Sequence, residues 1–535
     1  MTKDLNKSKN LDGGLKIKKE RGRTSPTYVG ENLDGRIRTS GKPKNLDGRI
    51  RTSGKPENLD GRVRVRIAPS PTGLFHIGTA RTALFNFLFA KKNNGDFILR
   101  IEDTDKKRSQ KHFEKNIIES LDWLGLKRDE GPVAGGNYGP YRQSERTEIY
   151  QKYLKKLLKS GEAFYCFEEE KRGTEKAKGF RDVYFSKDRD IPLVEANKRV
   201  KAGESCIIRF KSPKKETIIF GDLIRGKVEV KTEVIGDFSI AKNISEPLYN
   251  FAAVVDDQEM EISHVIRGED HISNTPKQIL LQKALGFNIP KYIHLPLILG
   301  PDKTKLSKRH NTVSLEDYKK DGYLSEAMIN FMVLLGWNPG TEQEIFNLAE
   351  MVDKFSIKKV HLSGAVFNLN KLDWINGHYI RNFPLKTIVE LSRQYFKEDV
   401  SKEVFEKIVD ISRGRLKKLS DLPRDTEFFF NKPDYEAEIL NWKEMKKNDI
   451  KKSLEHSLAI FTKLKDRDFE VNQLSRILLK EARDFDDDRG QLLWPLRASL
   501  TGVASSPSPF EVASILKKEE SIKRIKVAIK LVVNN

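Results

Sequence analysis

Cysteine is nearly missing from this chain of 535 residues, which contains only Cys166 and Cys206. Two cysteines 40 positions apart, with no Cys-x-x-Cys pair, provide neither a disulfide framework nor the spacing of a tetrahedral zinc site, so no metal ligands are predicted. Long apolar runs are missing as well. No window approaches the roughly 18 apolar residues of a membrane span, and residues 1–10 lack the apolar stretch of a signal peptide. These absences predict a cytoplasmic protein in a reducing compartment, without a membrane partner.

Acidic residues are outnumbered by basic ones. Lys and Arg total 98 against 77 Asp and Glu, which gives a net charge of +21 and a pI of 9.5. A positive field of this size attracts polyanions such as RNA, although a lysine-rich surface that only favours solubility explains the same numbers. The length exceeds what one hydrophobic core serves, so three or four domains are expected.

The first 61 residues contain few apolar side chains and repeat themselves. The unit NLDGRIRTSGKPK begins at Asn32, a near copy begins at Asn45, and a third starts at Asn58, which is a 13-residue period. A unit this short, and this rich in Gly, Pro, Ser and Lys, cannot bury a core. We therefore expect residues 1–61 to be a disordered extension. Weak contact with RNA and a duplication without any role both stay open for it.

A strand, a loop and a helix are predicted next. Val63, Val65 and Ile67 alternate with arginines, the period of a strand, and a loop rich in Pro and Gly follows at residues 69–79, PSPTGLFHIGT. Apolar residues from position 80 onward have helical spacing. The amide groups that open such a helix, at the positive end of its dipole, attract a triphosphate. His76 stands just before this start, where an imidazole can donate to phosphate oxygens as negative charge builds.

The next apolar run, residues 97–101, ends in Glu102, Asp103 and Asp105. Open α/β sheets bind ligands at the carboxyl ends of their strands. We therefore expect three carboxylates to cluster there, where they would recognise an amino group or organise a metal ion.

The second half of the pattern begins at residues 262–267, which predict a strand ending in GEDH at 268–271. Thr275 is expected to be the N-cap of the following helix, with Pro276 at its first position and Gln278 completing a capping box. An apolar strand over 293–299 then leads into KLSKRH at 305–310. This stretch is predicted to be a mobile loop, with Lys308 free to reach the pyrophosphate end of ATP.

The loop motif at 69–79 and the basic motif at 305–310, in this order and about 230 residues apart, resemble the two ATP-binding signatures of class I aminoacyl-tRNA synthetases. Further segments make residues 62 to about 380 similar to the bacterial-type glutamyl-tRNA synthetases. They are ARTALFN at 80–86, ILRIEDTD at 98–105, YRQSER at 141–146, VVDD at 254–257, HVIRGEDH at 264–271 and LDWING at 372–377.

The resemblance implies roles for individual residues, with His76 and Lys308 as the catalytic pair. ATP would be held by His76, Gly78, Thr79, Lys305, Ser307 and Lys308. Glutamate would be held by Arg66, Ala68, Ser70, Glu102, Tyr249 and Arg267. A guanidinium at Arg66 or Arg267 suits the side-chain carboxylate of glutamate, and Glu102 suits its α-ammonium group. Which arginine meets which carboxylate stays open.

The implied reaction is the ATP-dependent ligation of L-glutamate to the 3′ end of tRNA(Glu) through a glutamyl-adenylate, with release of AMP and pyrophosphate. The resemblance implies ATP and Mg²⁺ as cofactors, bound tRNA before activation, and a monomer; charging of tRNA(Gln) stays open. Thr79 and Leu306 depart only slightly from the class signatures. Because Cys166 has no neighbouring cysteine, the structural zinc found in the inserted domain of some relatives is not expected.

The resemblance also implies a domain order and a fold class. We expect an α/β Rossmann-like class I catalytic domain with an inserted α+β acceptor-binding domain, followed by an all-helical anticodon-binding region. The expected segments are the extension at 1–61, a first Rossmann half at 62–141, the insertion at 142–247, a second half at 248–305, a basic loop and connecting helical domain at 306–379, and the helical region at 380–535. Arg415 and Arg497 are its candidate tRNA contacts, although ordinary helix-face charges explain them equally well.

Two other functions compete with glutamylation. A catalytically silent RNA-binding relative would show decay of one ATP motif, whereas His76 and Lys308 are both present. A glutamine-specific synthetase shares the architecture, but the PSPTG loop and the helical C-terminal half favour the glutamate enzyme. Pyrophosphate exchange with glutamate or with glutamine separates these readings.

Overall fold

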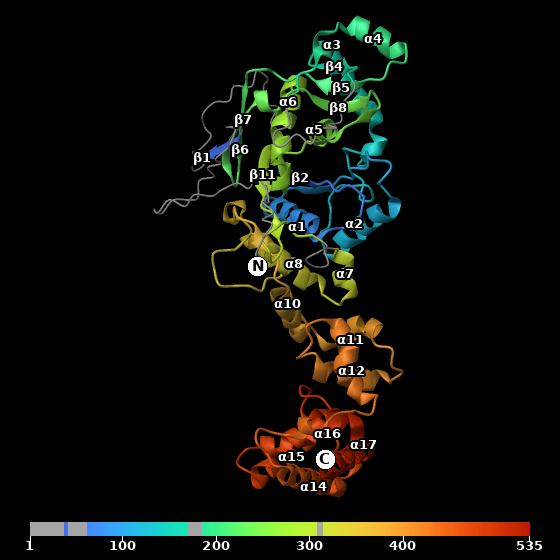
Figure 1. The fold of residues 1–535 in the computed structure, drawn as a ribbon, viewed down its shortest axis with the longest axis vertical. Coiled ribbons are helices and arrows are strands. Elements are labelled where there is room, and N and C mark those ends of the chain that lie inside the picture. Colours follow the sequence, from blue (N-terminus) through green and yellow to red (C-terminus); the bar gives the residue numbers. More distant parts are fainter. Residues whose placement is uncertain (1–36, 41–60, 169–183, 308–313, 535) are drawn as a thin grey trace, which may run out of the picture. The chain divides into compact units, whose positions relative to one another are not determined.

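The computed structural model describes residues 37–40, 61–168, 184–307 and 314–534 (Figure 1). The chain divides into two compact units: Met1–Asp317 with Ile329–Asn368, and Tyr318–Met328 with Leu369–Asn535. The finer division into six segments stays a prediction. Among the described residues, no helix is long and apolar enough to cross a membrane.

The first unit is built around parallel strands from two distant parts of the chain. These strands are β2 (Arg64–Ile67), β3 (Asp96–Leu99), β10 (His264–Gly268) and β11 (Lys291–Leu295). β2 pairs with β3, and β10 pairs with β11, both in parallel. Ser263 N donates to Arg64 O at 3.0 Å and so joins the two halves. The strands predicted at 62–67, 97–101 and 262–267 are confirmed, with ends shifted by one or two residues.

Helices cover this sheet because their sequences are apolar on most faces. α1 (Ile77–Lys92) is buried along nearly its whole length, and α5 (Tyr249–Glu259) and α6 (Thr275–Leu285) are also largely buried. α6 ends at Gly286, whose φ of 72° is one that glycine adopts without strain. The predicted capping box at Thr275 is wrong. Asn274 holds the cap position and its side chain makes no cap hydrogen bond, while the Thr275 hydroxyl accepts a hydrogen bond from Arg267.

A hairpin from the predicted insertion extends the sheet of β10 and β11. β6 (Thr217–Asp222) and β7 (Gly226–Lys231) are antiparallel, and β6 joins β11 in parallel where Tyr292 pairs with Asp222. β1 (Ile37–Ser40) then pairs antiparallel with β7. This strand differs from the expectation of disorder throughout residues 1–61. The pairing runs from Ile37 opposite Val230 to Ser40 opposite Lys227. The rest of that extension, up to residue 60, lies outside the described residues.

The remainder of the predicted insertion is α+β. An antiparallel sheet has the order β4 (Ala163–Cys166), β5 (Ile207–Phe210), β8 (Phe238–Asn243) and β9 (Glu246–Pro247). It is accompanied by α3 (Thr147–Ser160) and α4 (Leu193–Lys201). One hydrophobic core runs from Phe210 and Phe238 in this sheet to Phe251 on α5. The predicted insertion and α5 therefore share a core.

The segment from β12 to β13 belongs mainly to the first unit, whereas its residues Tyr318–Met328 belong to the second. β12 (Ile298–Leu299) pairs in parallel with β13 (Ala365–Val366), and α7 (Leu315–Lys320), α8 (Ser325–Leu334) and α9 (Leu348–Lys354) lie between them in the sequence. The start of α9 is fixed by a capping box in which Asn347 Oδ1 accepts from Glu350 N and Glu350 Oε2 accepts from Asn347 N.

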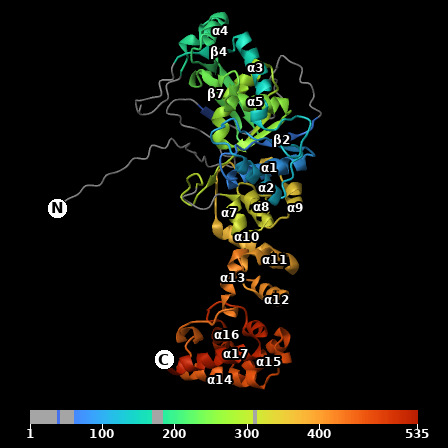
Figure 2. The same cartoon turned by 90° about the vertical axis from the view of Figure 1, so that its right-hand side faces the viewer.

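The second unit is helical, and its described residues from 369 to 534 contain no strand. Its longer helices are α10 (Leu369–Asn382), α11 (Leu385–Ser392), α12 (Lys402–Ser412), α14 (Lys447–Lys463), α15 (Val471–Phe485), α16 (Gly490–Thr501) and α17 (Pro509–Asn534). α14 to α17 form one cluster in both views (Figures 1 and 2). Leu454 and Phe461 of α14 are fully buried in its core.

Candidate active site

A cavity of about 1180 Å³ lies in the first unit, at the carboxyl ends of β2, β3 and β10. Ten of the twelve residues predicted to bind ATP or glutamate line it: Arg66, Ala68, Ser70, His76, Gly78, Thr79, Glu102, Tyr249, Arg267 and Lys305. Ser307 is described but is not among the lining residues, and Lys308 lies outside the described residues. The two predicted groups therefore meet in one cavity, although 201 positions separate Arg66 from Arg267.

His76 lines the cavity and also caps the N-terminus of α1. Its Nδ1 accepts a hydrogen bond from Gly78 N at 2.9 Å. Because Nδ1 is an acceptor, the neutral imidazole carries its proton on Nε2, which suits donation to a phosphate oxygen. A Cβ at Gly78 would lie 3.2 Å from this Nδ1, so glycine makes room for the cap. The first turn of α1 contains no acidic residue, and its amide groups keep their attraction for an anion.

A buried charge network lies beside the cavity. Arg66 donates from Nε and Nη2 to the two carboxylate oxygens of Asp257, at 3.0 and 3.2 Å. Arg100, which is fully buried, donates to Asp257 at 2.6 Å and to Glu102 at 3.1 Å. Burial alone would lower the pKa of Arg100, but Asp257, Asp256 and Glu102 together raise it. Arg66 and Glu102 are thus held rigidly at the cavity wall.

The negative charge of Glu102 is only partly balanced by the arginines of this network. Burial raises the pKa of Glu102, against the opposing effects of Arg100 and Arg66. A bound cation beside it would favour the ionised form. The neighbouring acids do not supply the cluster expected from the sequence: Asp103 accepts hydrogen bonds from Ser144 N and Oγ, and Asp105 pairs with Arg108 at 2.6 Å. Of the three acids, Glu102 and Asp105 line the cavity and Asp103 does not, and Asp105 is paired with Arg108.

Arg267, which lines the cavity, has one donor atom without a partner. Its Nε donates to His294 Nε2 at 3.2 Å and its Nη2 donates to Thr275 Oγ1 at 2.7 Å. Its Nη1 is buried and has no hydrogen-bond partner. A buried, unsatisfied donor on a charged group is costly, so this atom favours an anionic ligand in front of it.

His271 lines the same wall, and sequence analysis did not single it out. Its Nδ1 lies 3.2 Å from the hydroxyl of Tyr249. Burial, with a smaller effect from Arg267, lowers the pKa of His271 to about 4, so the ring is neutral at pH 7. Its position at the end of the GEDH run, directly after a strand, was the available signal.

The basic segment begins beside the cavity. Lys305 pairs with Asp270 at 3.0 Å, and both side chains are largely exposed, so the pair contributes little stability and leaves the ammonium available. On the other side of the segment, Ser314 forms a backbone bridge with His76, and Leu315 N donates to Phe75 O at 3.1 Å. The described residues that flank 308–313 are thus attached to the sheet and to the loop that carries His76.

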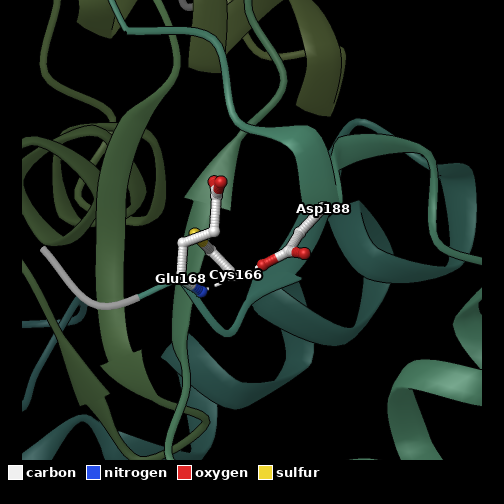
Figure 3. Close-up of side chains that lie close together, drawn as sticks. All are labelled: Cys166, Glu168 and Asp188. Atoms are coloured by element: carbon white, nitrogen blue, oxygen red, sulfur yellow. Dashed lines mark hydrogen bonds between the residues drawn. The ribbon is translucent and has the colours of Figure 1, made fainter.

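Cys166, Glu168 and Asp188 form the group of candidate metal ligands found among the described residues (Figure 3). Their oxygens already have partners. Asp188 Oδ2 accepts from Phe167 N at 2.7 Å and from Glu168 N at 3.0 Å, and Glu168 Oε2 accepts from Ser186 Oγ at 2.6 Å. Within residues 61–168 and 184–307 the group offers three ligands, and two of them already accept hydrogen bonds, as in a hydrogen-bonded junction. The absence of zinc stays a prediction.

The second unit brings the two candidate tRNA contacts together. Arg415 Nη1 donates to Ser505 Oγ at 3.1 Å, and Arg497 Nη2 donates to Ala504 O at 2.9 Å. Burial, and then the charge of Arg415, lowers the pKa of Arg497. The Arg497 guanidinium also lies 4.3 Å from the ring centroid of Trp494. Two like charges beside one exposed loop attract an anion.

Comparison with known proteins gives a consistent result. The catalytic domain of class I tRNA synthetases (E and Q) matches residues 62–374, and an anticodon-binding domain matches residues 387–529. A glutamate–tRNA ligase of Carboxydothermus hydrogenoformans is 46% identical, covering 86% of this chain and 98% of that protein. Glutamate–tRNA ligase 2 of Caldicellulosiruptor saccharolyticus is 41% identical, covering 86% and 97%.

A crystal structure extends the similarity to three dimensions. A glutamate tRNA ligase of Elizabethkingia meningosepticum, solved in complex with its amino acid, superposes with a TM-score of 0.78 at 35% identity and covers 88% of this chain and all of that one. The predicted fold class, an α/β catalytic part followed by a helical anticodon-binding part, is confirmed. Family models that together match most of the chain, and relatives matched over nearly their whole length, identify it as a member of the class I tRNA synthetases of the glutamyl and glutaminyl type, among the glutamate–tRNA ligases.

Proposed function

We propose that this protein ligates L-glutamate to the 3′ end of tRNA(Glu) in an ATP-dependent reaction that passes through glutamyl-adenylate and releases AMP and pyrophosphate. The observation that carries the proposal is the single cavity in which a helix N-terminus capped by His76 faces the same space as Glu102 and Arg267. The former suits a triphosphate, and the latter two suit a zwitterion with an additional carboxylate.

Charge complementarity supports glutamate as the amino acid. Glu102, whose pKa is raised by burial, would be relieved by an α-ammonium group. The buried Nη1 of Arg267 would donate to one substrate carboxylate. Arg66 stands beside them with two of its donors committed to Asp257, which fixes its guanidinium in place for the other carboxylate. Glutamine has a neutral amide where glutamate has a carboxylate, so one arginine would keep an uncompensated charge.

The reaction needs no protein nucleophile. The substrate α-carboxylate attacks the α-phosphorus of MgATP and pyrophosphate leaves; a ribose hydroxyl of the tRNA terminus then takes the acyl group and AMP leaves. We assign donation to phosphate oxygens to His76 Nε2, and attraction of the leaving pyrophosphate to Lys305 and Lys308. Catalysis would come from positioning and from stabilisation of developing charge. Mg²⁺ enters as part of the nucleotide substrate and neutralises its phosphates.

Binding of tRNA is assigned to the second unit and to the insertion. Arg415 and Arg497, which lie beside one exposed loop, are the proposed anticodon contacts. The two unpaired cysteines fit the reducing cytoplasm, where we place the protein, and we propose that it acts as a monomer.

The test is pyrophosphate exchange in the presence of tRNA, with glutamate or glutamine, followed by charging of tRNA(Glu) and tRNA(Gln) with labelled glutamate. We expect exchange with glutamate and charging of tRNA(Glu). Charging of both tRNAs would define a non-discriminating enzyme. Exchange with glutamine alone would replace this proposal with a glutaminyl synthetase, and no exchange with either would leave a silent RNA-binding protein. A parallel chain starting near Arg62 measures whether the extension contributes.

A further inference from the structure

Arg267 is held from behind by side chains that do not reach the cavity. Its Nε and Nη2 donate to His294 and Thr275, and neither of these residues lines the cavity. His294 and Thr275 also contact each other, with Thr275 Oγ1 3.0 Å from His294 Nε2. The three residues come from β10, β11 and α6, so three elements converge on one guanidinium.

A fourth element fixes the protonation of His294. Its Nδ1 lies 2.7 Å from Asp222 Oδ2, which also accepts from His294 N at 2.9 Å, and both side chains are fully buried. Donation from Nδ1 to the carboxylate leaves the lone pair on Nε2 as an acceptor, and this acceptor is what the Arg267 Nε–H requires. Asp222 is the last residue of β6, the strand that the hairpin adds to the catalytic sheet.

The surroundings of His294 keep the ring neutral. Burial lowers its pKa; Arg267 and Arg225 act in the same direction, and Asp222 opposes them. Tyr292 stacks on the ring at 6.0 Å with an interplanar angle of 8°. A protonated ring would carry hydrogens on both nitrogens and could not accept from Arg267. The whole arrangement therefore depends on one tautomer of one buried histidine.

We propose that Asp222, His294 and Thr275 are positioning residues that fix the guanidinium of Arg267 so that its remaining Nη1–H points at a carboxylate of glutamate. This inference rests on the proposed function, in which Arg267 binds the amino acid. The hydrogen bond between Asp222 and His294 orients His294 Nε2 as an acceptor. This nitrogen and the Thr275 hydroxyl together set the plane of the Arg267 guanidinium. A donor fork held on two of its three nitrogens presents the third in a single direction.

The experiment measures KM for glutamate and KM for ATP separately, in pyrophosphate exchange by the full chain with tRNA. Thr275→Val removes the hydroxyl and keeps the shape, whereas Thr275→Ser retains the hydroxyl. His294→Leu removes the acceptor, whereas His294→Gln offers an amide oxygen in its place. The matched control is Tyr292→Phe, at a residue on the same strand as His294. The change removes a buried hydroxyl that is bonded to Gln282 of α6, and it keeps the ring next to Arg267.

We expect Thr275→Val and His294→Leu to raise KM for glutamate roughly tenfold to a hundredfold, the range for losing one hydrogen bond to a charged group, with KM for ATP changed less than about threefold. Thr275→Ser and His294→Gln should recover most of that loss, and Tyr292→Phe should leave both constants near their wild-type values. If His294→Leu does not fold, the valine and serine variants at position 275 decide the question.

Equal changes in both KM values, or a lowered melting temperature with an unchanged KM for glutamate, would reduce these residues to a structural role and overturn the inference. Failure of the inference is distinct from failure of the proposed function. A wild-type chain that activates glutamate while Thr275→Val does so equally well refutes only the positioning role, and a wild-type chain without glutamate activation refutes both.

Discussion

Replacing His76 by asparagine removes the imidazole from the cavity and keeps an oxygen that can accept the hydrogen bond from Gly78 N. The cap at the start of α1 consists of that 2.9 Å bond from an extended backbone position, and asparagine is among the best N-cap residues. The free energy of unfolding should therefore change by only a few tenths of a kcal/mol in His76→Asn. His76→Ala loses the cap as well and should cost about 1 kcal/mol.

The two variants should nevertheless share one catalytic defect. Both lack the Nε2–H that we assign to the phosphate oxygens, and the loss of one donor to a developing anion typically costs about 10²–10³ in kcat, or roughly 3–4 kcal/mol. Pyrophosphate exchange at saturating glutamate and ATP, with tRNA present, measures the loss in kcat. Urea unfolding of the same preparations measures the free energy that the cap contributes to stability.

The decisive result is whether His76→Asn and His76→Ala lose the same factor in kcat. If His76→Asn exchanges pyrophosphate at nearly the wild-type rate while His76→Ala is slow, the histidine acts by capping α1 and not on phosphate. If both variants retain the wild-type rate, the assignment of His76 to ATP is wrong altogether, whatever happens to stability.

Three further outcomes follow from the contacts described above. Asp257→Asn leaves the buried Arg100 and Arg66 without their shared carboxylate and should lower the free energy of unfolding by about 3–5 kcal/mol in urea; a loss below about 1 kcal/mol would contradict the buried network. Purified protein should contain no stoichiometric zinc, and a chelator should not shift its melting temperature, because the carboxylates beside Cys166 already accept hydrogen bonds; one equivalent of metal by elemental analysis would overturn this. Burial lowers the pKa of His264 from 6.5 to about 4. The stability that depends on the neutral ring, about 3 kcal/mol, is therefore fully present above pH 6.5 and is lost as the pH falls towards 4. His264→Gln should flatten that part of the stability–pH curve, and an unchanged curve would refute the role of His264.

Local patterns predicted local structure well. The alternation from Val63 to Ile67 and the helical spacing after residue 80 are properties of a few neighbouring residues, and both elements formed where expected. The helical character of the second unit was expected from the family resemblance. The ten predicted residues around the cavity came from the family resemblance, whereas the strand pattern by itself predicted only that ligand-binding residues gather at the carboxyl ends of parallel strands.

Partners distant in sequence could not be predicted in this way. Arg66 is paired with Asp257, 191 positions away, and no feature of either neighbourhood indicates the other. The sequence around Thr275 predicted an N-cap, yet the Thr275 hydroxyl accepts a hydrogen bond from Arg267. A charged donor is a stronger partner than a backbone amide. His294 lies inside an apolar strand, where a lone histidine gives no sign of the tautomer that it must hold.

The pairing of β6 with β11 limits how this enzyme can be taken apart. An engineer who removed residues 142–247 as a cassette would also remove the strand that covers one edge of the catalytic sheet, and would expose the backbone of Lys291–Leu295 to pairing with other chains. The cut would also delete Asp222, the hydrogen-bond partner of His294. A graft between family members should therefore carry the β6–β7 hairpin with the catalytic domain, and exchange only the sheet of β4, β5, β8 and β9.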